Sequence, residues 1–197
     1  MLNEKLKNRH LILASGSPRR QGFFKSLGLD FEIRLKPVKE DYPPRLTHFE
    51  ISNYLAQLKA LPFKDELQDN DILITSDTIV WHNDTALGKP KNEDDAFLIL
   101  RSLSNATHEV ITSVCFTSKN YEKTLHNITK VTFKALTDDE IRYYIKTCKP
   151  FDKAGAYGIQ EWIGEIGVTK IEGSYFNVMG LPVHLVYKTL NDMANTK

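Results

Sequence analysis

Several charged residues of this chain have the types needed to hydrolyse a polyphosphate. Arg19 and Arg20 are adjacent, and guanidinium groups offer fork-shaped donors that suit phosphate oxygens. Asp77 interrupts an apolar run at the expected end of a strand, where a carboxylate either accepts local hydrogen bonds or faces a cleft. Cleavage of a phosphoanhydride needs cations to neutralise charge and a carboxylate to orient or deprotonate water. The further charged candidates are Glu40, Lys59 and Lys89.

A divalent cation would assist this chemistry, and Mg²⁺ suits it because it binds one or two carboxylates together with phosphate oxygens. No dense ligand motif is therefore expected. The chain contains no HExxH, no paired CxxC and no Walker-type glycine loop. Its six histidines are scattered without metal-ligand spacing, and Ser15 and Ser17 lack a GxSxG elbow. These observations disfavour zinc enzymes, P-loop enzymes and serine hydrolases.

The stretch from Leu11 to Arg20 is expected to position the two arginines. Its apolar beginning has the length of one buried strand, Ser17 suits a helix N-cap, and Pro18 suits the first helical position. A strand that ends in small residues at a helix N-terminus leaves backbone N–H groups directed at one spot. A capped turn with solvated arginines would explain the pattern equally simply. Two arginines in the first turn oppose the helix dipole, and this favours an anion site.

The remaining periodicity predicts a mixed α/β chain in which strands alternate with helices and also pair as hairpins. Capping boxes are expected at Thr47 with Glu50 and at Thr137 with Glu140, and Asn92 is expected to cap a further helix. A last helix is expected to open at Pro182. The expected later strands are 31–35, 72–74, which ends at the segment 75–78 and is continued by 79–81, then 85–87, 108–117, 124–136, 166–171 and 175–178.

The composition limits the possible partners and location. The 197 residues are 41% hydrophobic and 26% charged, which fits one globular domain with a buried core. A formal net charge of +1 and the lack of a basic–aromatic stripe argue against nucleic acid and anionic membranes as partners. Cys115 and Cys148 are isolated, which favours a reducing compartment over a disulfide framework or a zinc site. With no apolar run long enough for a signal peptide or a membrane span, we expect a cytoplasmic protein.

Taken together, the motifs resemble those of the Maf family of nucleotide pyrophosphatases. They occur in the family's order and cover roughly Leu11 to Leu190. The matching segments are Ala14-Ser15-Gly16-Ser17-Pro18-Arg19-Arg20, Glu40, Lys59-Ala60, Ser76-Asp77-Thr78, Gly88-Lys89-Pro90, Asp152–Gln160 (DKAGAYGIQ) and Gly180-Leu181-Pro182.

The resemblance implies a fold, a reaction and roles for particular residues. The implied fold is an elongated mixed β-sheet with flanking helices in two lobes around a central cleft, as in inosine triphosphatases, within a single domain spanning 1–197. The implied reaction is metal-dependent hydrolysis of dTTP and UTP to the monophosphate and pyrophosphate, with Mg²⁺ or Mn²⁺. The implied catalytic residues are Asp77 (the proton acceptor for water), Lys89 and Glu40; the implied metal ligands are Glu40 and Asp77; the implied substrate-binding residues are Ser15, Arg19, Arg20, Lys59, Thr78 and Gln160.

The sequence departs from the family pattern at two places. Pro37 and Lys39 stand where members often carry acidic residues before the position of Glu40, and Glu161 follows Gln160 where glycine is common. The resemblance also implies a homodimer as a partner state. Two other functions stay open on the sequence alone: a nucleotide-binding regulatory protein linked to cell division without turnover, and an inosine-triphosphate-type house-cleaning pyrophosphatase.

Overall fold

The computed structural model of the protein describes residues 1–195, and these residues form two compact units. The first unit comprises residues 1–77, 112–127 and the chain from Gly180, and the second comprises residues 78–111 and 128–179. The single domain expected over 1–197 stays a prediction, and residues 196–197 of it lie outside the described part of the chain.

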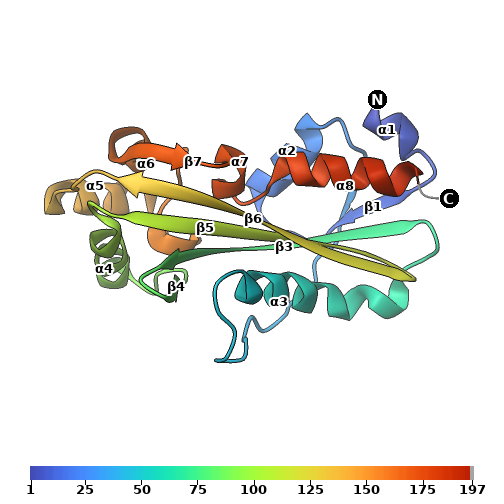
Figure 1. Cartoon of the computed structure of the whole chain (residues 1–197), viewed down its shortest axis with the longest axis horizontal. Helices are drawn as coiled ribbons and strands as arrows, with labels where there is room; N and C mark the ends of the chain where they lie inside the picture. The colour runs from blue at the N-terminus through green and yellow to red at the C-terminus, as the bar shows by residue number, and fades with distance from the viewer. Residues whose placement is uncertain (196–197) are drawn as a thin grey trace. The chain divides into compact units, whose positions relative to one another are not determined.

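The strands form one mixed sheet of seven strands within the described residues, in the order β2-β1-β3-β5-β6-β7, with β4 paired to β3 (Figure 1). β1 is parallel to both β2 and β3, whereas the β3–β4 and β6–β7 pairs are antiparallel. The predicted class, a mixed sheet with flanking helices, is confirmed. The strand bounds are β1 His10–Leu13, β2 Glu32–Ile33, β3 Asp71–His82, β4 Thr85–Leu87, β5 Thr107–Ser118, β6 Tyr121–Phe133 and β7 Val168–Glu172.

In the first unit, strict alternation along the strands divides the core between two faces of the sheet. Leu11 and Leu13 pack in one cluster with Phe24 of α2, whereas Ile12 between them packs in another with Ala56 of α3. Helices α2 and α8 accordingly lie on one side of the strands of this unit and α3 on the other (Figure 1). The helix bounds are α1 Leu2–Lys5, α2 Pro18–Ser26, α3 Phe49–Ala60, the 3₁₀ helix η1 Leu61–Glu66 and α8 Val183–Asn195.

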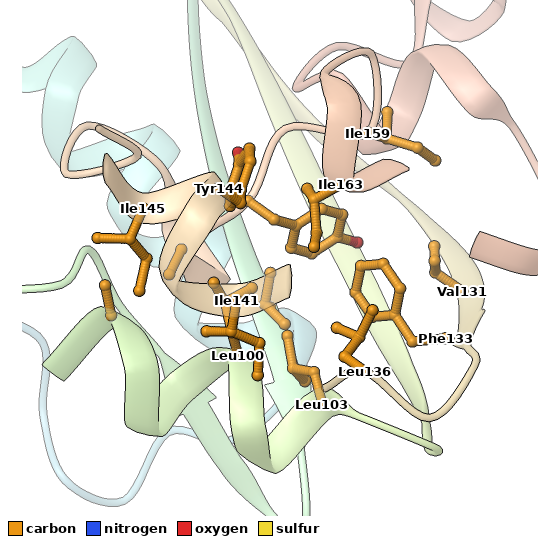
Figure 2. Close-up of a cluster of buried hydrophobic side chains, with 14 of the residues drawn as sticks. Leu100, Leu103, Val131, Phe133, Leu136, Ile141, Tyr144, Ile145, Ile159 and Ile163 are labelled. Atoms are coloured by element: carbon orange, nitrogen blue, oxygen red, sulfur yellow. The ribbon is translucent and has the colours of Figure 1, made fainter. Parts of the chain in front are cut away.

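In the second unit, two amphipathic helices pack their apolar faces together. Leu100 and Leu103 of α4 share a buried cluster with Ile141 and Tyr144 of α5 (Figure 2). Both predicted caps are confirmed, because Asn92 accepts a hydrogen bond from the Asp95 amide and Thr137 forms the complete capping box. The helix bounds are α4 Glu93–Leu103, α5 Asp138–Cys148, the 3₁₀ helix η2 Ala154–Ala156, α6 Trp162–Gly167 and α7 Tyr175–Val178.

Three expected strands are wrong in whole or in part. The segment Tyr175–Val178 is a helix, because Ser174 caps it by accepting a hydrogen bond from the Asn177 amide and so outweighs the β-propensity of its aromatic residues. The strand expected from residue 166 starts at Val168, since the residues before it complete α6. The expected strand 31–35 contracts to the two residues of β2.

Three further boundaries differ from the sequence prediction. The Thr47–Glu50 box is only half formed: the Glu50 carboxylate accepts from the Thr47 amide at 3.0 Å, but the helix itself begins after His48. β6 begins at Tyr121 and ends at Phe133, earlier at both ends than predicted. β3 does not stop before Asp77 but continues through it, because Ile79 and Val80 supply a second buried half.

The predicted turn after His82 is confirmed. Asn83 and Asp84 both adopt positive φ angles, 48° and 56°, as a two-residue hairpin with a type I′ turn requires. Within residues 1–195, no helix combines the length and the hydrophobicity that crossing a bilayer would demand.

Candidate functional site

The candidate site of the first unit lies where parallel strands end. β1 pairs with β3 as far as Leu13 and Ile74, and the Ala14 amide adds one more bond to the Ile74 carbonyl. The chain of β1 then turns into α2 while β3 continues toward Asp77. The carboxyl ends of parallel strands are the usual place for ligands in open α/β sheets.

The turn between β1 and α2 is fixed by serine side chains. Ser17 caps α2 by accepting from the Arg20 amide at 3.5 Å, and its own amide donates to Ser15 Oγ at 3.3 Å. The side chain of Gln21 donates to the Ser15 carbonyl at 3.1 Å. The strand–turn–helix predicted from the sequence is therefore confirmed, with Ser15 buried at its centre.

Arg20 joins three segments that are remote in sequence. Its Nε donates to the Gly180 carbonyl at 2.8 Å, and its Nη1 donates to the Ser76 carbonyl at 2.9 Å. These acceptors account for an arginine in the first turn of a helix, where the dipole alone would disfavour it. Arg20 is thus a structural link as well as a candidate ligand for an anion.

Lys59 of α3 contacts two carboxylates on the face of β3 that is opposite to α2. Its Nζ lies 2.6 Å from Asp77 Oδ1 and 3.1 Å from Glu40 Oε1. Thr75 and Asp77 share one face of the strand, and the Thr75 hydroxyl donates to the Ala56 carbonyl of α3 at 2.6 Å. This bond fastens α3 to β3 about one helical turn from Lys59, so the lysine reaches Asp77.

Burial and charge act in opposite directions on Asp77. Its side chain is only 8% exposed, and this burial raises the pKa of Asp77 above its usual value, with a smaller upward effect from Glu40. Lys59 and then Arg20 lower the same pKa, but burial prevails. Burial likewise lowers the pKa of the Arg20 guanidinium, and Asp77 opposes that shift. A carboxylate with a raised pKa is a stronger base than an ordinary aspartate.

The first unit therefore brings three of the predicted site residues, Lys59, Glu40 and Arg20, close to Asp77. Arg19 contributes positive charge that Arg20 experiences. The predicted residues of this unit are Ser15, Arg19, Arg20, Glu40, Lys59 and Asp77.

The other predicted residues, Thr78, Lys89 and Gln160, belong to the second unit. There the amide of Gly155 donates to the carbonyl of Gly88 at 3.1 Å, so the segments that carry Lys89 and Gln160 are joined. Gly155 has φ +69°, and a Cβ on it would lie 2.6 Å from Val80 Cγ2. Only glycine fits this turn.

Sequence reasoning missed some contacts that organise these segments. The carbonyls of Ser76 and Gly180 carry no side-chain signal, so their bonds to Arg20 follow only from the fold. In the second unit, Tyr144, Glu161 and Lys153 form a polar network beside Gln160. Tyr144 lies on the buried apolar face of α5, and its hydroxyl was the only sequence signal for this network.

Asp77 and Glu40 are the residues of this cluster that could hold a divalent cation together with phosphate. Asp77 and Glu40 both contact a single ammonium group, so their carboxylate oxygens face a shared position that a cation already occupies. Two carboxylates are the usual protein contribution to such Mg²⁺ sites. Within residues 1–195, no three His, Cys, Asp or Glu side chains gather in a manner that could hold a metal ion.

Comparison with known proteins gives consistent matches. A family model described as Maf-like protein matches residues 10–193. The dTTP/UTP pyrophosphatase of Flavobacterium johnsoniae is 64% identical over 193 residues, which cover 98% of this chain and 100% of the relative. That of Christiangramia forsetii is 57% identical over 196 residues, covering 100% of both chains. The Ham1 protein of Staphylococcus aureus superposes with a TM-score of 0.54 at 16% identity, covering 94% of this chain and 100% of that one, a likeness of fold alone.

Proposed function

The chain belongs to the Maf family, and on that premise we propose that it hydrolyses nucleoside triphosphates, with dTTP and UTP as preferred substrates, to the monophosphate and pyrophosphate. Relatives named dTTP/UTP pyrophosphatase, 57% to 64% identical over nearly the full chain, support this proposal. The observation that carries it is the buried Asp77 beside Lys59 and Arg20. Attack of water on a phosphoanhydride requires a base to accept the proton and cations to neutralise the developing charge.

In the proposed reaction, Asp77 accepts a proton from the attacking water. The water oxygen forms a bond to phosphorus, the bond between the α phosphate and its bridging oxygen to the β phosphate breaks, and pyrophosphate leaves. The raised pKa of Asp77 favours this proton transfer, while the charges of Lys59 and Arg20 lower the pKa and so oppose protonation of the carboxylate. Burial also excludes bulk water from the base.

The phosphates are proposed to contact positively charged side chains. These are Lys59, Arg19 and Arg20, with the Ser15 segment at the start of α2, and the exposed Lys89 is proposed as a further catalytic cation. Glu40 and Asp77 would hold Mg²⁺ or Mn²⁺, which when bound would neutralise phosphate charge.

Selection of the base is assigned to neutral side chains. Thr78 and Gln160 provide donors and acceptors that match the edge of a pyrimidine. A homodimer is part of the same proposal, and light scattering of the purified protein tests it. One chain has a mass of 22.6 kDa, so a measured mass close to this value would reject the dimer.

Pyrophosphate release from a panel of nucleotides, with Mg²⁺, Mn²⁺ or a chelator, tests the reaction. We expect release from dTTP and UTP to exceed release from GTP and ITP, and the chelator to abolish it. Asp77→Asn should lower turnover by at least about 100-fold and leave nucleotide binding intact. Asp71→Asn is the matched control, since Asp71 is a buried aspartate of the same strand that bonds the Gln68 amide instead.

Two results would reject the proposal. Nucleotide binding by the unaltered protein without any release of pyrophosphate would indicate a regulatory protein. Faster cleavage of ITP than of dTTP would indicate an inosine-triphosphate-type enzyme.

A further inference from the structure

The turn that carries Gln160 is held by a network separate from the Asp77 cluster. In this turn the Glu161 amide donates to the Gly158 carbonyl at 3.0 Å, so Gln160 is its third residue. Ile159 before it is buried in the core of the second unit, and Gln160 itself is partly exposed. The main chain is thus fixed immediately before and after the glutamine.

One phenol bonds both ends of this turn. The Tyr144 hydroxyl of α5 accepts from the Gly158 amide at 3.0 Å and donates to the Glu161 carboxylate. Tyr144 is completely buried, in the same cluster as Ile159 and Ile163 (Figure 2). Burial, and then the bond to Glu161, raise the pKa of Tyr144, so the phenol stays neutral and remains the donor at physiological pH.

The Glu161 carboxylate also forms an ion pair with the buried ammonium group of Lys153, at the start of the loop. Lys153 Nζ lies 3.1 Å from Glu161 Oε1 and 2.7 Å from Asp152 Oδ1, and the lysine side chain is only 9% exposed. The Lys153–Glu161 ion pair therefore connects the beginning of the segment 152–161 to its end. This residue stands where glycine was expected from the family pattern.

The turn leaves no room for a side chain at Gly158. A Cβ on Gly158 would lie 2.8 Å from Glu161 Cδ, so the carboxylate packs directly over the Gly158 main chain. Removal of the phenol oxygen would leave the Gly158 amide and one carboxylate oxygen without their buried partner. The turn would then move to recover hydrogen bonds, and Gln160 would move with it.

We propose that Tyr144 is a positioning residue for nucleobase selection: its hydroxyl fixes the turn 158–161 and thereby sets the place of the Gln160 amide. This inference rests on the proposed function, in which Gln160 meets the base. Tyr144 itself contacts neither base nor phosphate in this proposal. Its loss should therefore weaken discrimination between bases much more than it slows the chemical step.

Tyr144→Phe removes only the hydroxyl, and Tyr143→Phe is the matched control. Tyr143 is the preceding residue of α5, is half exposed and packs on Trp162 with its ring. For Tyr144→Phe we expect the ratio of kcat/KM for dTTP to that for GTP to fall roughly 10-fold, through a higher KM for dTTP with kcat changed less than about threefold. Exchange of the Gly158 amide should become faster. The control should change neither.

An unchanged dTTP-to-GTP ratio in folded Tyr144→Phe would overturn the inference. Where that variant does not fold, Glu161→Ala, which removes the acceptor of the Tyr144 hydroxyl, is expected to lower the ratio in the same direction, and an unchanged ratio in this variant overturns the inference equally. If the unaltered protein releases no pyrophosphate, the proposed function fails separately. In that case calorimetry measures the ratio of the affinities for dTTP and GTP, and this ratio decides the role of Tyr144. The same ratio in Tyr144→Phe and in Tyr143→Phe would overturn the inference, as would the absence of any nucleotide binding.

Discussion

Replacement of Lys59 by methionine tests the electrostatic basis of the Asp77 site. Methionine keeps most of the apolar stem and removes the ammonium group that Asp77 and Glu40 share. Asp77 then retains the charge of Arg20, but it loses its direct ion pair. The expected result is a loss of stability that depends on the ionisation of Asp77.

The size of the loss follows from burial. The Lys59 and Asp77 side chains are 19% and 8% exposed, and removal of one partner from a buried pair costs about 3–5 kcal/mol. Because Lys59 is partly exposed, we expect the lower limit, about 3 kcal/mol, or roughly 6–12 °C in Tm for a chain of this size. The bond to Glu40, whose side chain is 45% exposed, adds less than about 1 kcal/mol.

The sign of the pH dependence is fixed by Asp77. Its pKa in the folded protein is raised above the unfolded value, so its contribution to stability is fully present below the unfolded pKa and is lost as pH rises through the folded pKa. Without Lys59 this pKa rises further. The difference in unfolding free energy between the unaltered protein and Lys59→Met should therefore be small in acid and should widen as pH rises.

Denaturant unfolding at several pH values, with a double-mutant cycle, provides the measurement. Asp77→Asn combined with Lys59→Met should recover most of the lost stability, because no unpaired buried carboxylate remains. Lys64→Met is the control, since the Lys64–Glu122 pair is more exposed, at 42% and 30%, and should cost less than about 1 kcal/mol. A loss in Lys59→Met no larger than in the control, or no recovery in the double variant, would refute the reasoning.

Two further predictions concern the second unit. Gly155→Ala should destabilise the protein by about 1–3 kcal/mol in denaturant unfolding, because its φ of +69° and its contact with Val80 exclude a Cβ; Gly22→Ala, in helix α2 with no atom within 4 Å of the new Cβ, should instead add about 0.5–1 kcal/mol. Burial, and then His82, lower the pKa of His108 from 6.5 to about 3, so the unfolding free energy should fall as pH drops through this interval. The variant His108→Gln should show a smaller fall in denaturant unfolding at several pH values. An equally steep fall in the variant would exclude His108 as the source of this pH dependence.

Local sequence signals were sufficient to predict helix starts where residues nearby in the chain supply the hydrogen-bond partner. Ser17 with Pro18, Asn92 and the Thr137–Glu140 box each satisfy helix amides within a few positions, and the structure contains all of them. The same logic failed at Tyr175–Val178, where aromatic and branched residues indicated a strand. There a serine cap, itself a local signal, outweighed β-propensity.

The site itself depended more on contacts between distant segments. Asp77, Lys59 and Arg20 could be chosen from residue type and resemblance, but the carbonyl partners of Arg20 lie 56 and 160 residues away and have no sequence signature. The position of Asp77 inside a continuous strand was also missed. A strand that keeps a charged residue in its middle needs a neighbour to neutralise it, and spacing alone does not show that α3 delivers Lys59 there.

The opposed influences on Asp77 explain why several remote segments are needed to make one base. An exposed aspartate has a pKa near 4 and is a weak base at neutral pH. Burial alone would raise its pKa and favour the protonated form, which accepts no proton from water. Lys59 from α3 and Arg20 from α2 counter that effect, and Arg20 is itself held by the chain beyond Gly180. The basicity of Asp77 is therefore a property of the folded first unit, and a change that loosens Arg20 from the Gly180 carbonyl should raise the pKa of Asp77 without touching it.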